Sequence, residues 1–122
     1  MDTDVNKKDD RGRTQLFHAA STGELLKCTN LINEGANLDD QDNEGDTALI
    51  EASYRGHTDV VKILCESGAQ VDMVNYHKNS ALIKAANNGY VDVVRILCYH
   101  GAEVNKLNLE NQTALFWAAW QH

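Results

Sequence analysis

Hydrophobic and polar positions along residues 45–69, GDTALIEASYRGHTDVVKILCESGA, form two short amphipathic segments. In the first segment, Leu49 is followed by the small pair Ala52-Ser53, which gives one apolar helical face. In the second, apolar residues recur at i, i+1, i+4 and i+5, namely Val60, Val61, Leu64 and Cys65. The polar break Arg55-Gly56-His57 separates the two segments. The pattern therefore predicts two short helices, each with one buried stripe.

This pattern repeats every thirty-three residues along the chain. Equivalent positions hold Thr14, Thr47, Ser80 and Thr113, then Leu16, Leu49, Leu82 and Leu115, then Ala19, Ala52, Ala85 and Ala118. The glycines Gly23, Gly56 and Gly89 keep the same spacing, as do Gly35, Gly68 and Gly101. A period of this size is typical of a stacked repeat array. Since one unit alone leaves its apolar face in water, neighbouring units must cover it.

The residues at the ends of each segment predict where the helices begin and end. A Thr or Ser hydroxyl caps the first helix by accepting a backbone N–H, and Gly35, Gly68 and Gly101 supply the left-handed backbone that ends the second. We therefore expect an all-α repeat solenoid with three full units and a partial fourth. The expected boundaries are a flexible N-terminal segment at 1–8 and an array at 9–122, with repeats at about 9–41, 42–74, 75–107 and 108–122.

The stretch DNEGDTALIEASYRGHTDVVKILCESGAQVDMV resembles the ankyrin repeat family, whose pattern is D-x-x-G-x-T-P-L-H-x-A-A-x-x-G-H-x-x-V-V-x-L-L-x-x-G-A-x-x-N. The resemblance covers the chain from about Asp9 to its C-terminus. It implies an L-shaped stack of helix-turn-helix units with β-turn or hairpin fingers at right angles to the helices. It also implies a concave face, formed by the fingers and first helices, that binds other proteins without catalysing a reaction.

The chain departs from the family pattern at three positions. The proline inside the first helix is replaced by Gln15, Ala48, Ala81 and Ala114, and the histidine after the leucine by Phe17, Ile50, Ile83 and Phe116. We expect burial to replace the hydrogen bonding of that histidine. The turn glycines Gly12 and Gly45 become Lys78 and Asn111 in the later units. Because lysine tolerates a left-handed backbone poorly, we expect a strained or differently shaped third finger.

Composition and charge narrow the function. The 122 residues carry a net charge of −7, which disfavours nucleic acid and anionic membranes because both attract clustered Lys and Arg. We expect a cytoplasmic protein, with the nucleus as the alternative, since the N-terminus resembles neither a secretory signal nor a transit peptide. The expected partner is another protein or a peptide, and no small-molecule substrate.

Cysteine and histidine chemistry is disfavoured. Cys28, Cys65 and Cys98 occupy apolar positions, and one repeat of stacking, about 8 to 10 Å, holds the last two too far apart for a disulfide. The five histidines lack a partner that would make a nucleophile–base pair or a zinc set. We therefore expect no enzyme activity, no cofactor and no metal. Asn105 is similar to the asparagine that hydroxylases modify in some ankyrin repeats, which is a weak indication.

Candidate partner-binding residues are the solvent-facing positions of the first helices and fingers. They are Arg11, Arg13, Glu44, Asp46, Glu51, Tyr54, Arg55, Tyr76, His77, Asn79, Lys84, Asn87, Asn88, Trp117 and Trp120. Aromatic and arginine side chains supply most interface energy, so Tyr54, Arg55, Tyr76, Trp117 and Trp120 are favoured. Each aromatic residue has a second interpretation, as a side chain packed against its neighbour.

Two functions remain open. The first is a protein-interaction module that binds a partner through its concave face. The second is the N-terminal targeting or substrate-recruiting part of a larger enzyme or effector whose activity lies beyond residue 122. The last stretch, TALFWAAWQH, has a first helix without a second helix to cover it. We expect either a longer array or a monomer that associates weakly through this uncapped end.

Overall fold

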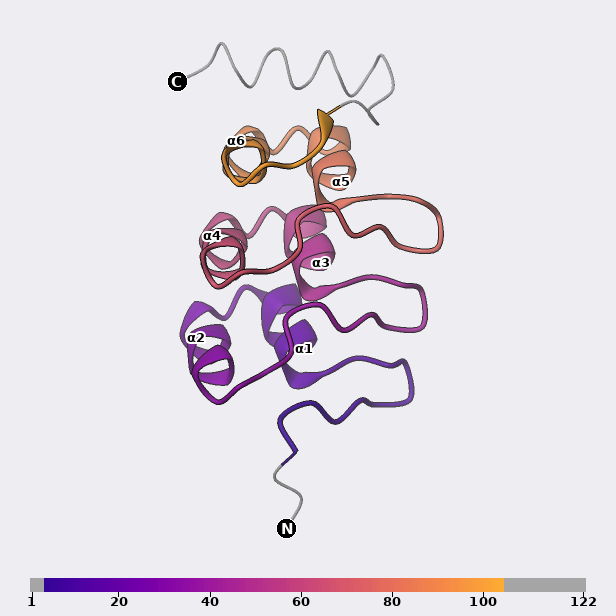
Figure 1. The fold of residues 1–122 in the computed structure, drawn as a ribbon, viewed down its shortest axis with the longest axis vertical. Helices are drawn as coiled ribbons and strands as arrows, with labels where there is room; N and C mark the ends of the chain where they lie inside the picture. The colour runs from indigo at the N-terminus through magenta and orange to yellow at the C-terminus, as the bar shows by residue number, and fades with distance from the viewer. Residues whose placement is uncertain (1–3, 105–122) are drawn as a thin grey trace.

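The computed structural model describes residues 4–104 and contains six helices in three stacked pairs (Figure 1). The first helices of the pairs are α1 (Gln15–Thr22), α3 (Ala48–Arg55) and α5 (Ala81–Asn87). The second helices are α2 (Leu25–Asn33), α4 (Thr58–Glu66) and α6 (Val91–Tyr99). Each set forms its own column, and loops project from the side of the first helices (Figure 1). This is the predicted all-α repeat solenoid.

The helix boundaries follow the caps predicted from the sequence. The hydroxyls of Thr14, Thr47 and Ser80 accept a hydrogen bond from the backbone N–H three residues later, each at 3.2 Å. These bonds satisfy an N–H that otherwise has no partner in the first helical turn. Gly56 ends α3 with φ 76°, a left-handed conformation that a residue with a Cβ adopts at a cost. The predicted hydroxyl caps at Thr14, Thr47 and Ser80 are therefore confirmed, whereas Thr113 lies outside the described residues.

One continuous core runs through the three helix pairs. Leu16, Leu49 and Leu82 are each 1% exposed and belong to the same cluster of buried side chains. Alanines surround them at the contacts between α1, α3 and α5, and small side chains let these helices approach closely. The second helices add Val60, Val61 and Leu64 with their equivalents from α6. The predicted interior row of leucines is confirmed for these three members, whereas Leu115 lies outside the described residues.

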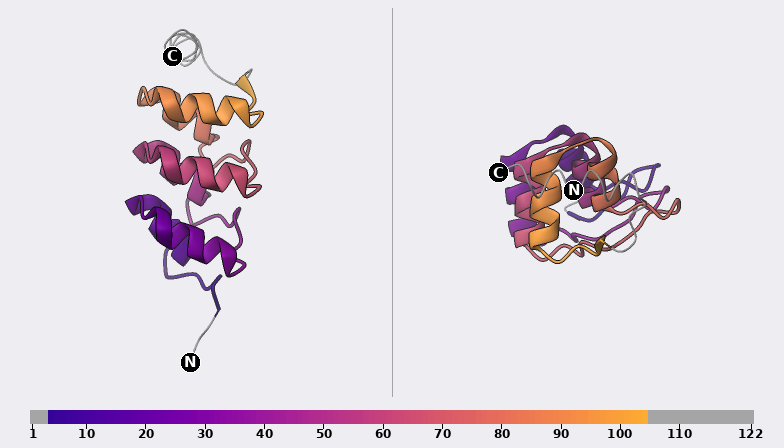
Figure 2. Two further views of the ribbon diagram at one scale, coloured as in Figure 1. Left: turned by 90° about the vertical axis from the view of Figure 1, so that its left-hand side faces the viewer. Right: turned by 90° about the horizontal axis from the view of Figure 1, so that it is seen from above.

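The loops between helix pairs are fingers that stand at an angle to the helices (Figure 2, right). Each finger closes on a side-chain oxygen. In the second finger, Asp42 Oδ1 accepts from the backbone N–H groups of Glu44 and Asp46, both at 2.9 Å. Asp9 and Asn75 make the same pair of bonds in the first and third fingers. Within residues 4–104 the fingers are turns with one isolated antiparallel bridge, Val74 to Ser80, and no extended sheet.

Within the N-terminal segment 1–8, Asn6 and Lys8 contact the array. Asn6 Oδ1 accepts from the Asn37 N–H at 2.7 Å, and Lys8 Nζ donates to the Gln41 carbonyl at 3.0 Å. Asn6 stands thirty-three residues before Asp39, which accepts from the Gln70 N–H in the same way at 2.9 Å. The contacts that join one repeat to the next therefore begin before Asp9, in residues 5–8.

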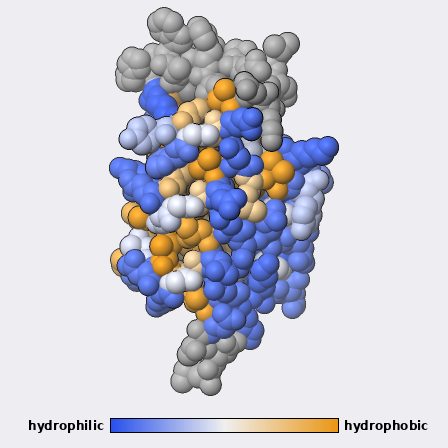
Figure 3. All heavy atoms as spheres, in the orientation of Figure 1, coloured by the Kyte–Doolittle hydropathy of each residue, from blue (hydrophilic) through white to orange (hydrophobic). Residues whose placement is uncertain are grey.

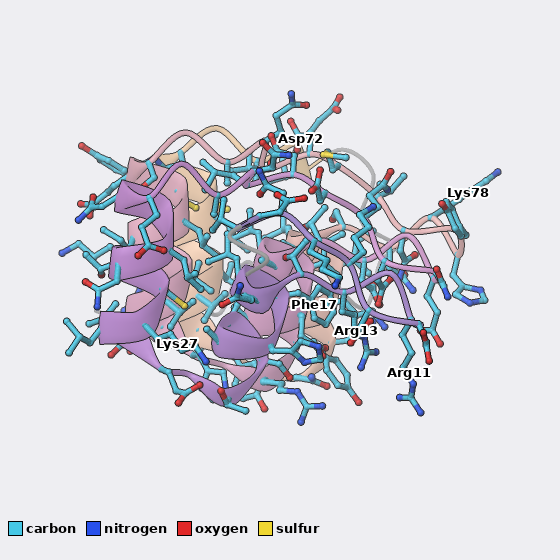
Figure 4. All side chains as sticks on the ribbon, turned by 90° about the horizontal axis from the view of Figure 1, so that it is seen from below. Arg11, Arg13, Phe17, Lys27, Asp72 and Lys78 are labelled. Carbon is cyan, nitrogen blue, oxygen red and sulfur yellow. The ribbon has the colours of Figure 1, made fainter. Side chains whose placement is uncertain are left out.

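The equivalent bond continues up the stack, where Asp72 Oδ1 accepts from the Glu103 N–H at 2.8 Å. Asp72 lies on the side of the molecule opposite Arg11 and Arg13 (Figure 4). This series of bonds joins each repeat to the next along the edge away from the angle between fingers and helices. Asn105, near the end of the third repeat, and the partial fourth unit fall outside the described residues.

Candidate partner-binding surface

The angle between the fingers and the first helices is the candidate surface. Seen along the stack, the helices form one arm of an L and the fingers the other (Figure 2, right). On the face drawn in Figure 3, which is the side of the loops after the second helices and not the inside of the angle, hydrophilic residues cover the fingers and a hydrophobic band lies over the helices. Phe17 and Arg13 lie where α1 meets the first finger, and Arg11 lies farther out along that finger (Figure 4).

Arg13 is held inside the array instead of projecting freely from it. Its Nε donates to Asp42 Oδ2 at 3.2 Å, and the Asp42 side chain is almost fully buried. The Arg13 guanidinium also lies over the Phe17 ring, 4.9 Å from its centroid. Phe17 occupies the position where the family pattern has histidine, and it is buried as expected. Arg13 therefore fastens the first finger to the second through an ion pair and a cation–π contact.

Asp46 makes the corresponding contact between the second and third fingers. Its Oδ1 accepts from Asn75 Nδ2 at 2.9 Å. Burial raises the pKa of the Asp46 carboxyl, while the Asn75 hydrogen bond opposes that rise. Asn75 stands where the other two fingers have Asp9 and Asp42. The amide avoids placing two carboxylates against each other at this position.

The exposed side of the first helices is also linked from repeat to repeat. Ser21 Oγ donates to Glu51 Oε2 at 3.3 Å, and the same carboxylate oxygen lies 3.6 Å from Arg55 Nε. The Glu51 side chain is only 12% exposed, whereas we expected it to face solvent. The close contact of α1 with α3 covers the Glu51 side chain. The helical period alone does not predict this burial, because it depends on how closely the two helices stack.

Tyr54 lies near the middle of the surface and is 45% exposed. The Lys84 ammonium sits 5.0 Å from the centroid of its ring, and Asn88 Nδ2 donates to its backbone carbonyl at 2.8 Å. Both contacts come from the next repeat: Asn88 holds the backbone at Tyr54, and Lys84 lies over its ring, which stays partly accessible. An aromatic ring that is already ordered loses little entropy when a partner covers it.

The finger tips differ from these linked residues. Arg11, Glu44, Tyr76 and His77 are exposed, and their side chains make no hydrogen bond or ion pair with any residue between 4 and 104. Tyr76 is 69% exposed and lies against Gly45, where an added Cβ would approach its ring to 2.8 Å. Asn79 is half-buried and Asn87 exposed. Trp117 and Trp120 lie outside the described residues.

Comparison with known families agrees with this architecture. The family described as Ankyrin repeats (3 copies) matches residues 1–75 and 71–122. The chain belongs to the ankyrin repeat family. Ankyrin repeats are generally protein–protein interaction modules and are typically not catalytic. The search of curated protein sequences found no match.

A departure from the ankyrin pattern in the third repeat explains a contact that the sequence did not reveal. In the second repeat, His57 follows the turn glycine, and its Nε2 hydrogen bonds to the Ser21 carbonyl at 2.9 Å. Tyr90 replaces this histidine in the third repeat, and its ring packs over Gly56. The carbonyl equivalent to that of Ser21 belongs to Tyr54, and Asn88 supplies the donor for it. In the sequence, the available signal for this contact was that Asn88 and Tyr90 both differ from the residues at the equivalent positions of the second repeat.

The thiols of this ankyrin array lie in or beside its core. Cys28 and Cys65 are buried, and burial raises the pKa of each thiol to about 11. Cys98 is half-buried, and burial raises its pKa as well. All three are free cysteines. The part of the chain from 4 to 104 holds no His, Cys, Asp and Glu group suited to a metal ion, and no helix there is long and apolar enough to cross a bilayer.

Proposed function

We propose that this ankyrin array is a non-catalytic module that binds a partner protein or peptide through the concave angle between its fingers and first helices. The observation that carries the proposal is Tyr54, an accessible aromatic residue whose ring contacts Lys84 and whose backbone carbonyl is bound by Asn88 of the next repeat. Arg55 lies beside it on α3 and is half exposed. Aromatic and arginine side chains at the centre of a surface are typical of protein-binding hot spots.

The exposed finger tips support the same proposal. Arg11, Glu44, Tyr76 and His77 offer charge, aromatic surface and hydrogen-bonding groups that the array does not use internally. The protected thiols, with pKa values raised by burial, support a role without nucleophilic chemistry. Free cysteines in the interior also suit the reducing environment of the cytoplasm or nucleus, where we place the protein.

The test is a pull-down from the native cell with a triple variant, Tyr54→Ala, Arg55→Glu and Tyr76→Ala. We expect partner proteins that the wild type captures to be lost, while helical circular dichroism stays unchanged because all three side chains are exposed. A matched control changes the outer helices instead, with Leu26→Ala and Tyr99→Ala, which are also exposed. Partner capture that survives the triple variant but not the control would place the interface on the outer helices.

A further inference from the structure

The third finger tip carries backbone strain that the other two fingers avoid. Lys78 has φ 64°, and it is the one non-glycine residue with positive φ between residues 4 and 104. The equivalent residues are Gly12 at φ 75° and Gly45 at φ 82°. A residue with a Cβ is disfavoured in this left-handed region, so Lys78 costs stability where glycine would not. Strain that persists at an exposed position points to a function for the side chain.

The strained turn is held rigidly by its own hydrogen bonds. Asn75 Oδ1 accepts from the N–H groups of His77 and Asn79 at 2.9 and 3.0 Å. The Lys78 N–H donates to the Asn75 carbonyl at 2.9 Å, and the Tyr76 N–H donates to the Glu44 carbonyl of the second finger at 3.0 Å. These bonds fix the backbone from which Tyr76, His77 and Lys78 project.

None of these three side chains is used to hold the array together by a polar contact. Tyr76, His77 and Lys78 are all exposed, and their side chains make no hydrogen bond or ion pair with any described residue. The Lys78 side chain extends from the far end of the fingers, well away from Phe17 (Figure 4). The tip therefore presents a primary ammonium group and a phenol ring two residues apart on a preorganised turn.

We propose that the tip formed by Tyr76, His77 and Lys78 anchors the partner through a single carboxylate flanked by an apolar side chain. The carboxylate pairs with the Lys78 ammonium group, and the apolar side chain covers the exposed face of the Tyr76 ring. This inference rests on the proposed binding function and names the partner's chemistry at one point of that surface.

The charge of the chain decides between one carboxylate and an acidic run. The net charge of −7 repels a polyacidic segment at long range, and Glu44 on the neighbouring finger repels a second carboxylate close by. A lone carboxylate with apolar neighbours avoids most of this repulsion and still pairs with the Lys78 ammonium group. The partner segment is therefore selected by its fit to the tip at close range and not by long-range electrostatic attraction.

The test is selection of a displayed library of random sixteen-residue peptides on residues 1–122, followed by affinity measurements with the selected peptides. We expect enrichment of one Asp or Glu beside an aliphatic or aromatic residue. We expect binding to weaken on the order of tenfold with Lys78→Gly, although this variant relieves the left-handed strain and raises the melting temperature. Lys78→Arg keeps the charge and is expected to retain binding within about threefold.

Two variants separate a local effect from a general one. Lys27→Gln removes the same charge from the outer helix α2, away from the fingers (Figure 4), and is expected to leave affinity unchanged. Peptides that bind Lys78→Gly as tightly as the wild type, but lose affinity to the Tyr54→Ala and Arg55→Glu changes, would overturn this inference and leave the proposed function standing. Enrichment of no peptide, or of peptides indifferent to every change on the concave side, would overturn both.

Discussion

At the scale of single residues, the finger contacts show how one amide replaces a charge. An aspartate suits position 42 because Arg13 faces it. The equivalent position in the next finger, Asn75, faces the carboxylate of Asp46 instead. Asn75 keeps the acceptor oxygen that closes its own turn and adds an N–H donor for Asp46. The sequence alone shows these residues as variable polar positions, because neither pairing is visible before the stacking offset between fingers is known.

We predict that Asn75→Asp destabilises the array at pH 7, by roughly 1–3 kcal/mol, because it sets two carboxylates in contact and removes a buried hydrogen bond. Burial already raises the pKa of Asp46, and the second carboxylate raises it further. An acid with a raised pKa in the folded state binds more protons than in the unfolded state, so stability returns as the pH falls.

Urea unfolding of this variant and the wild type at pH 7 and pH 5 measures the effect. The expected result is a gap between the two proteins that narrows at pH 5. Asn75→Ser serves as a control, because it removes the amide without adding a charge and its deficit should not shrink in this way. A gap that is constant with pH would show that the two carboxylates do not interact.

At the scale of elements, the turn between the helices of a pair is tied to the preceding repeat by one hydrogen bond to a backbone carbonyl. His57 provides it to Ser21 in the second repeat, and Asn88 provides it to Tyr54 in the third. The repeat pattern predicted the helices, their caps and the leucine row, since these depend on local period and burial. It assigned Asn88 to partner binding, because a donor that moves to a neighbouring position leaves no periodic signal.

We predict that Asn88→Ala lowers the free energy of unfolding by about 0.5–1.5 kcal/mol, since the Tyr54 carbonyl loses its donor. In a Tyr90→His background, which restores the histidine of the second repeat, the same change should cost less. Chemical unfolding of the four proteins of this double-mutant cycle gives the coupling energy. Additive effects would mean that a histidine at position 90 does not reach the carbonyl.

At the scale of the whole molecule, the array is a linear stack in which each repeat contacts its neighbours along the chain (Figure 2, left). Stability in such a stack is the sum of repeat terms and interface terms, so parts of it open separately. Cys28 lies in the first repeat and Cys65 in the second, each inside the common core. Their reactivity therefore reports the opening of different repeats.

We predict that a thiol reagent such as dithionitrobenzoate at pH 8 modifies Cys98 first and Cys28 and Cys65 slowly. The latter two are buried, and a thiol pKa of about 11 leaves little thiolate at this pH. The released chromophore is followed with time, and urea-unfolded protein, in which all three thiols react together, is the reference. A rapid release of three equivalents from the native protein would contradict the observed burial.

The bonds along the edge away from the fingers also govern how such a protein changes length. Asn6, Asp39 and Asp72 each hold the backbone N–H that stands thirty-one residues later. A deletion or insertion of a few residues changes the thirty-one-residue separation of the bond that spans it, while bonds elsewhere keep their separation. Adding or removing a whole thirty-three-residue step preserves every such bond, whereas a smaller change costs the one bond that spans it.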